Sequence, residues 1–419
     1  MSQAVRTPHA RSLKGLDWAN LFLADVRDGV GPFLGIYLLA SHDWDAAGIG
    51  VAMAAMGLAS VITQTPAGAL IDSTRRKRLL MALATAVVGV SCILMTIPAF
   101  VNIYAIVAFQ ALMGMAAAIL MPGLAAITLG MVGFKRYPGR QGRNEMFNHA
   151  GNAASAILAG VLGYLLSPEW VFFAVALFAV ASIVSILAIR EDDIDHELAR
   201  AAPESADKEH PKTAGLLTVL ADRRLLMFAI SVVLFHFANA AMMPVVGQYM
   251  ASSAPEGATL YMSACIVVAQ LVMIPMAKFA GRYCEIWGRK PVFLLAFAAL
   301  PVRGLLYTVS DDPAWLIAVQ TLDGIGAGIF GVVWLVMCAD LTRGTGRYNV
   351  TVGAIATAHA IGASASNVVT GFVVAATSYA GGFTFLAGAA AVGLVFFWTM
   401  VGETKPSAEE EPAPAAQPA

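Results

Sequence analysis

The chain alternates between long apolar stretches and short polar segments over nearly its whole length. A helix that crosses a bilayer needs about 20 mostly apolar residues, and about twelve stretches reach that length. They lie at about 17–40, 46–71, 79–98, 102–133, 145–167, 170–190, 223–250, 259–281, 291–309, 314–340, 349–376 and 382–402. The pattern therefore predicts an all-α membrane protein with about twelve transmembrane helices.

Composition supports this fold class. Hydrophobic residues make up 58% of the 419 residues and charged residues only 13%, and the mean hydropathy is +0.72. Soluble domains average about a quarter charged residues, so an ordinary soluble protein is excluded. The first apolar stretch has no convincing small-residue cleavage site, so we expect it to be retained as a helix rather than removed as a signal peptide.

The distribution of charge over the loops predicts the orientation. If the amino terminus is cytoplasmic, so are the loops at 72–78, 134–144, 191–222, 282–290 and 341–348, and these are rich in Lys and Arg, whereas the opposite loops hold none. Basic residues concentrate in cytoplasmic loops. We therefore expect a multi-pass protein of a bacterial cytoplasmic (inner) membrane with both termini in the cytoplasm.

The longest polar stretch, 191–222, separates six apolar stretches from six more. The last residues are rich in Pro, Ala and Glu, which is typical of disorder. The predicted organisation is a cytoplasmic amino terminus at 1–16, a six-helix bundle at 17–190, a cytoplasmic linker at 191–222, a second six-helix bundle at 223–402 and a disordered cytoplasmic tail at 403–419.

The four cysteines are scattered. Cys92, Cys265 and Cys338 fall in apolar stretches and Cys284 in a predicted short loop. No spacing among them is typical of a metal site or a disulfide framework. We expect them to be small apolar packing residues and expect no metal.

The two halves of the chain resemble each other. The segment "GALIDSTRRK" (68–77) matches "GRYCEIWGRK" (281–290), "FQALMGMAAAI" (109–119) matches "VQTLDGIGAGI" (319–329), and "GNAASAILAG" (151–160) matches "GASASNVVTG" (362–371). The shift between matching positions stays between 210 and 213 residues. A repeat at half length without insertions indicates a duplicated six-helix unit.

The repeated loop carries a family resemblance over about residues 15 to 403. It is similar to the signature G-x-L-A-D-[RK]-x-G-R-[RK] of the major facilitator superfamily of secondary transporters. The chain departs from the signature at Ser73 and Arg75, and the second copy supplies the missing glycine. The gating loops that the resemblance implies hold Gly68, Asp72, Arg76 and Lys77 in the first copy, and Gly281, Glu285, Gly288, Arg289 and Lys290 in the second.

The resemblance implies a fold and a mechanism. The fold is two pseudo-symmetric six-helix bundles with a site between them near the bilayer midplane, and the mechanism is alternating access. The carboxylate of Asp72, at a helix end, is expected to pair with a base or with the amino-terminal dipole of a helix from the other half. In the family this contact latches the outward-open state. A topology anchor without a gating role is the alternative for the basic residues and for Asp72.

Ionisable residues within the apolar stretches mark a second candidate site, because a charge in the bilayer is costly. Asp25 and Asp28 share a helix face and Arg27 points elsewhere. Family helices 1, 4, 7 and 10 line the cavity, so a carboxylate here could bind a proton or a cationic group. The alternative is a structural pair of Arg27 with one Asp.

Other polar residues fall in the same class. Arg303 is expected to reach inward with Asp323 as a plausible partner, in either a structural pair or a proton or anion site. The remaining cavity candidates are Gln110, His236 and Asn239. The secondary candidates are His149, Asn152, His359 and Asn367, which occupy similar places in the two halves and fit a packing role, and Glu145, which fits the gate network.

Several signatures are missing. Drug/proton antiporters of the family usually carry arginine at the position of Gln110 and a G-x-x-x-G-P-x-x-G-G pattern that 145–167 lacks. Neither a Walker-type phosphate loop nor a nucleophile–base pair stands out, so we expect no ATP drive, no enzyme activity and no cofactor.

Three functions remain open. The first is proton-coupled efflux of a small organic solute, with Asp25 or Asp28 carrying the proton. The second is proton-coupled uptake of an organic anion, with Arg27 or Arg303 binding it. The third is a membrane sensor or scaffold without transport. Expected partners are the solute, protons and the lipid bilayer, with no nucleic acid, and the chain is expected to be a monomer.

Overall fold

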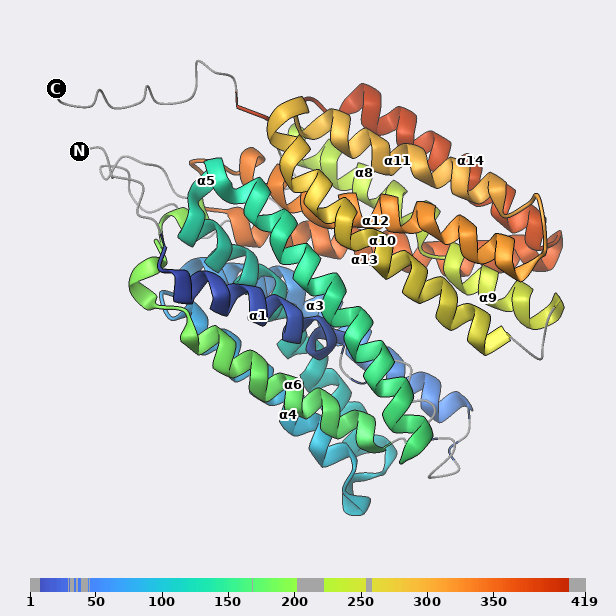
Figure 1. Cartoon of the computed structure of the whole chain (residues 1–419), viewed down its shortest axis with the longest axis horizontal. Coiled ribbons are helices and arrows are strands. Elements are labelled where there is room, and N and C mark those ends of the chain that lie inside the picture. Colours follow the sequence, from blue (N-terminus) through green and yellow to red (C-terminus); the bar gives the residue numbers. More distant parts are fainter. Residues whose placement is uncertain are drawn as a thin grey trace.

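The computed structural model describes residues 8–28, 30, 34, 37–38, 44, 46–167, 169–201, 222–253 and 258–406. These residues form helices and no strands (Figure 1). The helices in chain order are α1 (Ala10–Asp28), α3 (Ala46–Ser73), α4 (Lys77–Met95), η1 (Pro98–Phe100), α5 (Ile103–Leu165), α6 (Glu169–Ala188), η2 (Glu191–Asp193), η3 (Leu198–Arg200), α8 (Arg223–Asn239), α9 (Met242–Ser253), α10 (Ala258–Trp287), α11 (Arg289–Leu306), α12 (Pro313–Leu341), α13 (Tyr348–Ala376) and α14 (Tyr379–Met400).

The helices follow from the apolar sequence. Lipid offers no hydrogen-bond partners, so a spanning segment must satisfy its backbone groups internally, and a helix does so. Among the described residues, nine helices are long and apolar enough to cross a membrane, which makes this a multi-pass membrane protein. Side chains of Asn102, Asp222, Asp312 and Ser378 cap α5, α8, α12 and α14.

The prediction of a loop at 134–144 was wrong. These residues are helical, and α5 runs for 63 residues with one interruption at Gly133, where φ is 67° and ψ is 168°. That conformation is costly for residues with a Cβ, so glycine is suited to this turn. The chain therefore changes direction at one residue, and its two arms, 103–132 and 134–165, serve as separate helices.

One predicted span carries a turn, and one other boundary differs from the prediction. The predicted span 223–250 matches one candidate membrane span, Arg223–Met250, and a turn after Asn239 divides it into α8 and α9. The predicted loop 282–290 is helical up to Trp287 and turns at Gly288, where φ is 100°. Cys284 therefore lies in a helix rather than a loop, and it is buried and free like the other three cysteines.

The helices form two bundles that meet at one end. In Figure 1, α1, α3, α4, α5 and α6 lie together, and α8 to α14 form the second group. The main contacts between them are α3 with α13 and α5 with α10. The start of α1 and the end of α14 lie near the end where the bundles meet, and the bundles separate toward α9. We call the end that carries residues 74–76 and Gly288 the motif end.

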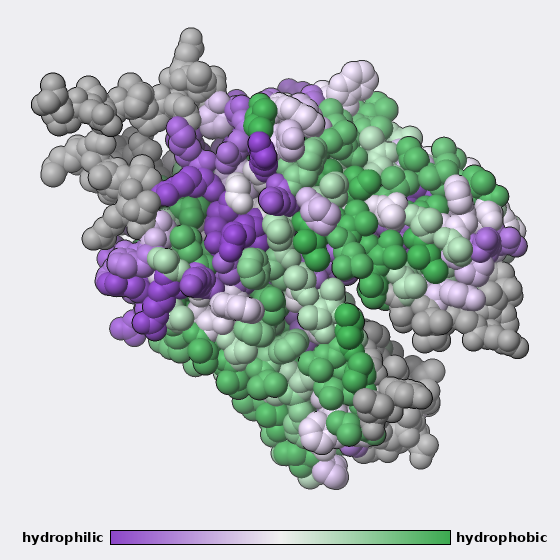
Figure 2. All heavy atoms as spheres, viewed as in Figure 1, coloured by the Kyte–Doolittle hydropathy of each residue, from purple (hydrophilic) through white to green (hydrophobic). Residues whose placement is uncertain are grey.

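The surface matches this arrangement. In Figure 2, hydrophilic residues gather at the motif end, and hydrophobic residues cover the flanks of both bundles. A notch separates the bundles at the other end of this view. The protein is therefore closed at the motif end and divided at the opposite end.

Candidate functional site

The motif end is held closed by a helix cap that crosses between the bundles. Asp72, in the last turn of α3, accepts hydrogen bonds at the start of α13 from the backbone N–H of Asn349 (3.3 Å), its side-chain amide (2.7 Å) and the backbone N–H of Val350 (2.9 Å). The first N–H groups of a helix have no partner within it, and the helix dipole favours a negative charge there. Since Arg347, the residue before α13, supplies no side-chain cap, Asp72 takes that role.

Small residues allow the two helices to approach. A Cβ on Gly68 would overlap the carbonyl group of Asn349, and a Cβ on Gly353 would overlap that of Gln64. Further along the α3–α13 contact, the hydroxyl of Thr357 lies 3.4 Å from Gln64 Oε1.

In the first copy of the loop, two basic residues differ in burial. Lys77 is buried and donates to the carbonyl of Thr74 (2.6 Å), whereas Arg76 is exposed.

The second copy of the loop makes a different cap. Gly281 of α10 packs against Gly142 of α5, in a close contact like that of Gly68. Glu285, which aligns with Asp72, is exposed. The amino terminus of α11 is capped instead by Glu403, which accepts from the backbone N–H of Arg289 (2.9 Å) and Lys290 (3.1 Å).

Residues 403–405 are therefore ordered, although the sequence predicts a disordered tail from 403. Lys405 Nζ donates to the carbonyl of Glu285 at 2.6 Å, close to the end of α10. Arg289 also forms a buried pair with Asp340 of α12 at 2.8 Å. Residues 403–405 thus bind the second copy of the loop and hold it against the second bundle. The rest of the predicted tail, 407–419, and linker residues 202–221 lie outside the described residues.

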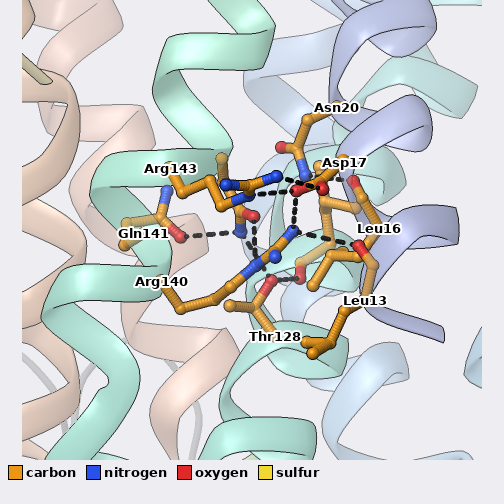
Figure 3. Close-up of polar contacts among 10 residues, drawn as sticks. Leu13, Leu16, Asp17, Asn20, Thr128, Arg140, Gln141 and Arg143 are labelled. Atoms are coloured by element: carbon orange, nitrogen blue, oxygen red, sulfur yellow. Dashed lines mark hydrogen bonds and ion pairs between the residues drawn. The ribbon is translucent and has the colours of Figure 1, made fainter. Parts of the chain in front are cut away.

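A buried charge cluster joins α1 to both arms of α5 (Figure 3). Asp17 lies between two arginine side chains and pairs with Arg140 at 2.7 Å and Arg143 at 2.8 Å. Arg140 also donates to Asn144, whose amide donates to Thr128 on the other arm. Sequence reasoning missed this cluster because both arginines lay in the expected loop. The signal was a pair of bases three residues apart, which share a helix face.

We expect replacement of Asp17 by asparagine to destabilise the fold by about 3 kcal/mol, because it leaves Arg140 buried without its counter-charge. Replacement of Arg143 by alanine is the matched control. The Arg143 side chain is 56% exposed against 7% for Arg140, so its loss should cost no more than about 1 kcal/mol. Equal losses in unfolding measurements in detergent would contradict this difference.

A second buried network lies within the second bundle. Arg303 of α11, 1% exposed, pairs with Asp323 of α12 at 2.6 Å. Its remaining donors meet Asn239 Oδ1 (2.7 Å), Tyr307 Oη (2.9 Å) and Gln320 Oε1 (3.0 Å). The structure thus brings together Arg303, Asp323 and Asn239, all candidates from sequence. Tyr307 and Gln320 were missed, although Gln320 aligns with the candidate Gln110.

The α5–α10 contact holds an ionisable pair. His149 of α5 bonds through Nδ1 to Gln270 Oε1 of α10 at 2.9 Å, and its Nε2 lies 4.0 Å from Glu145 Oε2. That Nε2 is buried without a hydrogen-bond partner among the described residues. Glu145 accepts from the amides of Gln141 and Asn148, both at 3.0 Å. We call Glu145, His149 and Gln270 the seam cluster.

Two imidazoles stack in the second bundle. The rings of His236 on α8 and His359 on α13 are 3.4 Å apart at their centroids and nearly parallel. His236 is buried with its Nε2 unpartnered among the described residues, and Phe330 of α12 packs edge-on against it. His359 is exposed. No pattern within one helix could have shown this contact.

The remaining candidates from the sequence lie in varied surroundings. Asp25 and Arg27 are half-buried in the last two turns of α1, and the side chain of Asp28 lies outside the described residues. Gln110 is buried and its amide lies 3.7 Å from Met95 Sδ. Asn152 is half-buried, and Asn367 is exposed and donates within α13 to Ala363.

Comparison with known proteins decides the family. The sequence profile described as Major Facilitator Superfamily matches residues 18–284 and again 267–418. The chain belongs to the major facilitator superfamily. It is similar to two proteins described as uncharacterized MFS-type transporters, from the CDC 1551 / Oshkosh and the ATCC 25618 / H37Rv strains of Mycobacterium tuberculosis. Identity to each is 45% over 404 residues, which cover 96% of both chains.

Membership of the family gives the general function. This member of the superfamily is a membrane solute transporter and not an enzyme. The transporter's two bundles touch mainly through the α3–α13 and α5–α10 contacts. Among the residues that the structure describes, no group of three or more His, Cys, Asp and Glu side chains could hold a metal ion.

Proposed function

We propose that this transporter exports a small organic solute in exchange for protons, across the cytoplasmic membrane of a bacterium. The motif end would face the cytoplasm, since it carries the basic loops. The described state would then be open to the outside. Counting the two arms of α5 separately and adding α1 and α11 to the candidate spans supports about twelve crossings in two six-helix bundles.

The seam cluster is the observation that supports proton coupling. A proton can drive alternating access only if it binds the two states with different affinity. His149 and Glu145 lie where α5 meets α10, and the partner of His149 belongs to the other bundle. A proton on His149 Nε2 would face the Glu145 carboxylate and change the free energy of this closed contact. Opening of the contact would expose both groups to water, so their proton affinity would change.

The second bundle gives less support to uptake of an organic anion. The Arg303 guanidinium is enclosed by Asp323, Asn239, Tyr307 and Gln320, so it has a counter-charge and few free donors. An anion would have to displace Asp323 or bind elsewhere. Asp323 itself is a poor proton carrier, because its protonation would leave a buried cation without a counter-charge.

The test is solute-dependent proton flux in proteoliposomes, with a pH dye and a panel of acidic, basic and neutral solutes. Glu145→Gln and His149→Phe should remove most of the solute-dependent proton flux, while solute–solute exchange continues. Gln141→Ala is the matched control, since it removes one neutral donor to Glu145 and leaves both ionisable groups. Asp25→Asn and Asp28→Asn test the carriers expected from sequence.

Each outcome separates the alternatives. Solute movement without proton flux in the wild type would contradict proton coupling and indicate a uniporter or another ion. Proton flux that survives in Glu145→Gln and His149→Phe but is lost in Asp25→Asn or Asp28→Asn would place the proton site on α1 instead. No response to any solute would favour a sensor or scaffold.

A further inference from the structure

A groove opens between α1 and α6 near the motif end. Its cavity volume is about 430 Å³. Arg11, Lys14 and Trp18 of α1 line one side, and Val184 and Ala188 of α6 line the other. At the base of the groove the two helices touch at Gly15 of α1. A Cβ on Gly15 would come within 2.9 Å of the backbone oxygen of Ser185 in α6.

The groove carries positive charge without local compensation. Among the described residues, Arg11 and Lys14 have no ion-pair or hydrogen-bond partner, and both are exposed. The Asp193 carboxylate of the η2 turn is already engaged. Asp193 accepts from Ser12 (2.6 Å) and contacts His9 (3.0 Å). Although partial burial raises the pKa of Asp193, these hydrogen bonds outweigh it and lower that pKa.

The groove continues into an apolar surface. Leu177, Val180, Val184 and Leu187 of α6 are at least half exposed and recur on one helix face. In Figure 2 the surface over α6 is hydrophobic, and hydrophilic residues gather toward the motif end. Trp18, which also lines the groove, is 49% exposed. Tryptophan is enriched where a membrane meets water.

We propose that this groove binds a phospholipid with an anionic headgroup. The phosphate lies against Arg11 and Lys14, and one acyl chain follows the apolar face of α6. Basic pockets between transmembrane helices on the cytoplasmic side are suited to such headgroups. The proposal concerns a surface away from the seam cluster, so it does not rest on proton coupling or on the direction of transport. It rests on the proposed function only in placing the motif end at the cytoplasmic side.

Native mass spectrometry of the delipidated full chain tests the proposal. The protein is titrated with phosphatidylglycerol or phosphatidylcholine of the same acyl chains. We expect the first lipid bound to be preferentially phosphatidylglycerol. The double variant Arg11→Ala/Lys14→Ala should reduce that preference by up to about 25-fold, because each base near an anionic surface contributes about fivefold.

Two further variants make the result specific. Arg223→Ala/Arg224→Ala removes two exposed bases from the start of α8 and should leave the preference unchanged. Ala188→Trp fills the groove without removing charge and should reduce retention of the lipid. Size-exclusion profiles and helical circular dichroism confirm that each variant is folded.

The proposal is overturned if the wild type holds both lipids equally, or if the two double variants lose the preference to the same extent. A third arm adds inorganic phosphate to the phosphatidylglycerol complex. Displacement at equal concentration would show a simple anion site and would also overturn the proposal. Retention of the lipid supports it.

Discussion

Replacing Asp72 with alanine is expected to shift the protein toward states that are open at the motif end and to reduce transport by at least about tenfold. The carboxylate accepts from two backbone N–H groups and one amide of α13. Each buried donor left without a partner costs about 1–3 kcal/mol. Water satisfies the same donors once the contact opens, so the cost falls on the closed state alone. A shift of about 5.5 kcal/mol would turn a 99:1 population into 1:99.

Distances between spin labels on the two bundles measure this shift. Labels at the exposed positions Arg75 and Arg282 report the separation at the motif end. Ser73→Ala is the matched control, since that neighbouring hydroxyl donates only to Leu70 of its own helix. Asp72→Asn keeps one acceptor oxygen and should give an intermediate shift. Unchanged distances in the alanine variant would show that the cap does not hold the bundles together.

Loss of either partner of the Arg303–Asp323 pair is expected to destabilise the second bundle by about 3–5 kcal/mol. Asp323→Ala leaves a buried guanidinium with only neutral acceptors, and Arg303→Met leaves a buried carboxylate. This is a large part of the total stability of a domain, about 5–15 kcal/mol. The double variant Arg303→Met/Asp323→Leu removes both charges and should cost clearly less than the sum of the single losses.

A double-mutant cycle on unfolding in detergent measures this coupling. The same variants distinguish a structural role from a role in transport. A structural pair predicts that the double variant recovers both stability and transport. If Asp323→Asn folds as stably as the wild type but loses proton flux, Asp323 carries protons and the structural interpretation is wrong.

Much of the fold followed from the sequence because the bilayer imposes a simple rule. Long apolar stretches must be helices, and the position of almost every helix was predicted on that basis. The errors lie where polar residues occur in a helix. Residues 134–144 look like a loop in composition, but they are helical because one face, with Arg140 and Asn144, is buried against α1 and the other arm of α5.

The candidate site was predictable in part. Arg303 and Asp323 could be paired because two opposite charges in neighbouring spans are too costly to leave apart. The family signature pointed to Asp72 and to a helix terminus as its partner. The stacked His236 and His359 rings and the contact of His149 with Gln270 depend on how helices far apart in sequence meet, and no periodicity within one helix contains that information.

The cap made by Glu403 has a practical consequence for anyone who fuses this protein to a reporter. A fusion joined directly after Val401 removes the acceptor for the N–H groups of Arg289 and Lys290, along with the clamp that Lys405 places on α10. Affinity handles and fluorescent proteins are better attached beyond residue 406, so that expression tests report the native protein rather than damage at the junction.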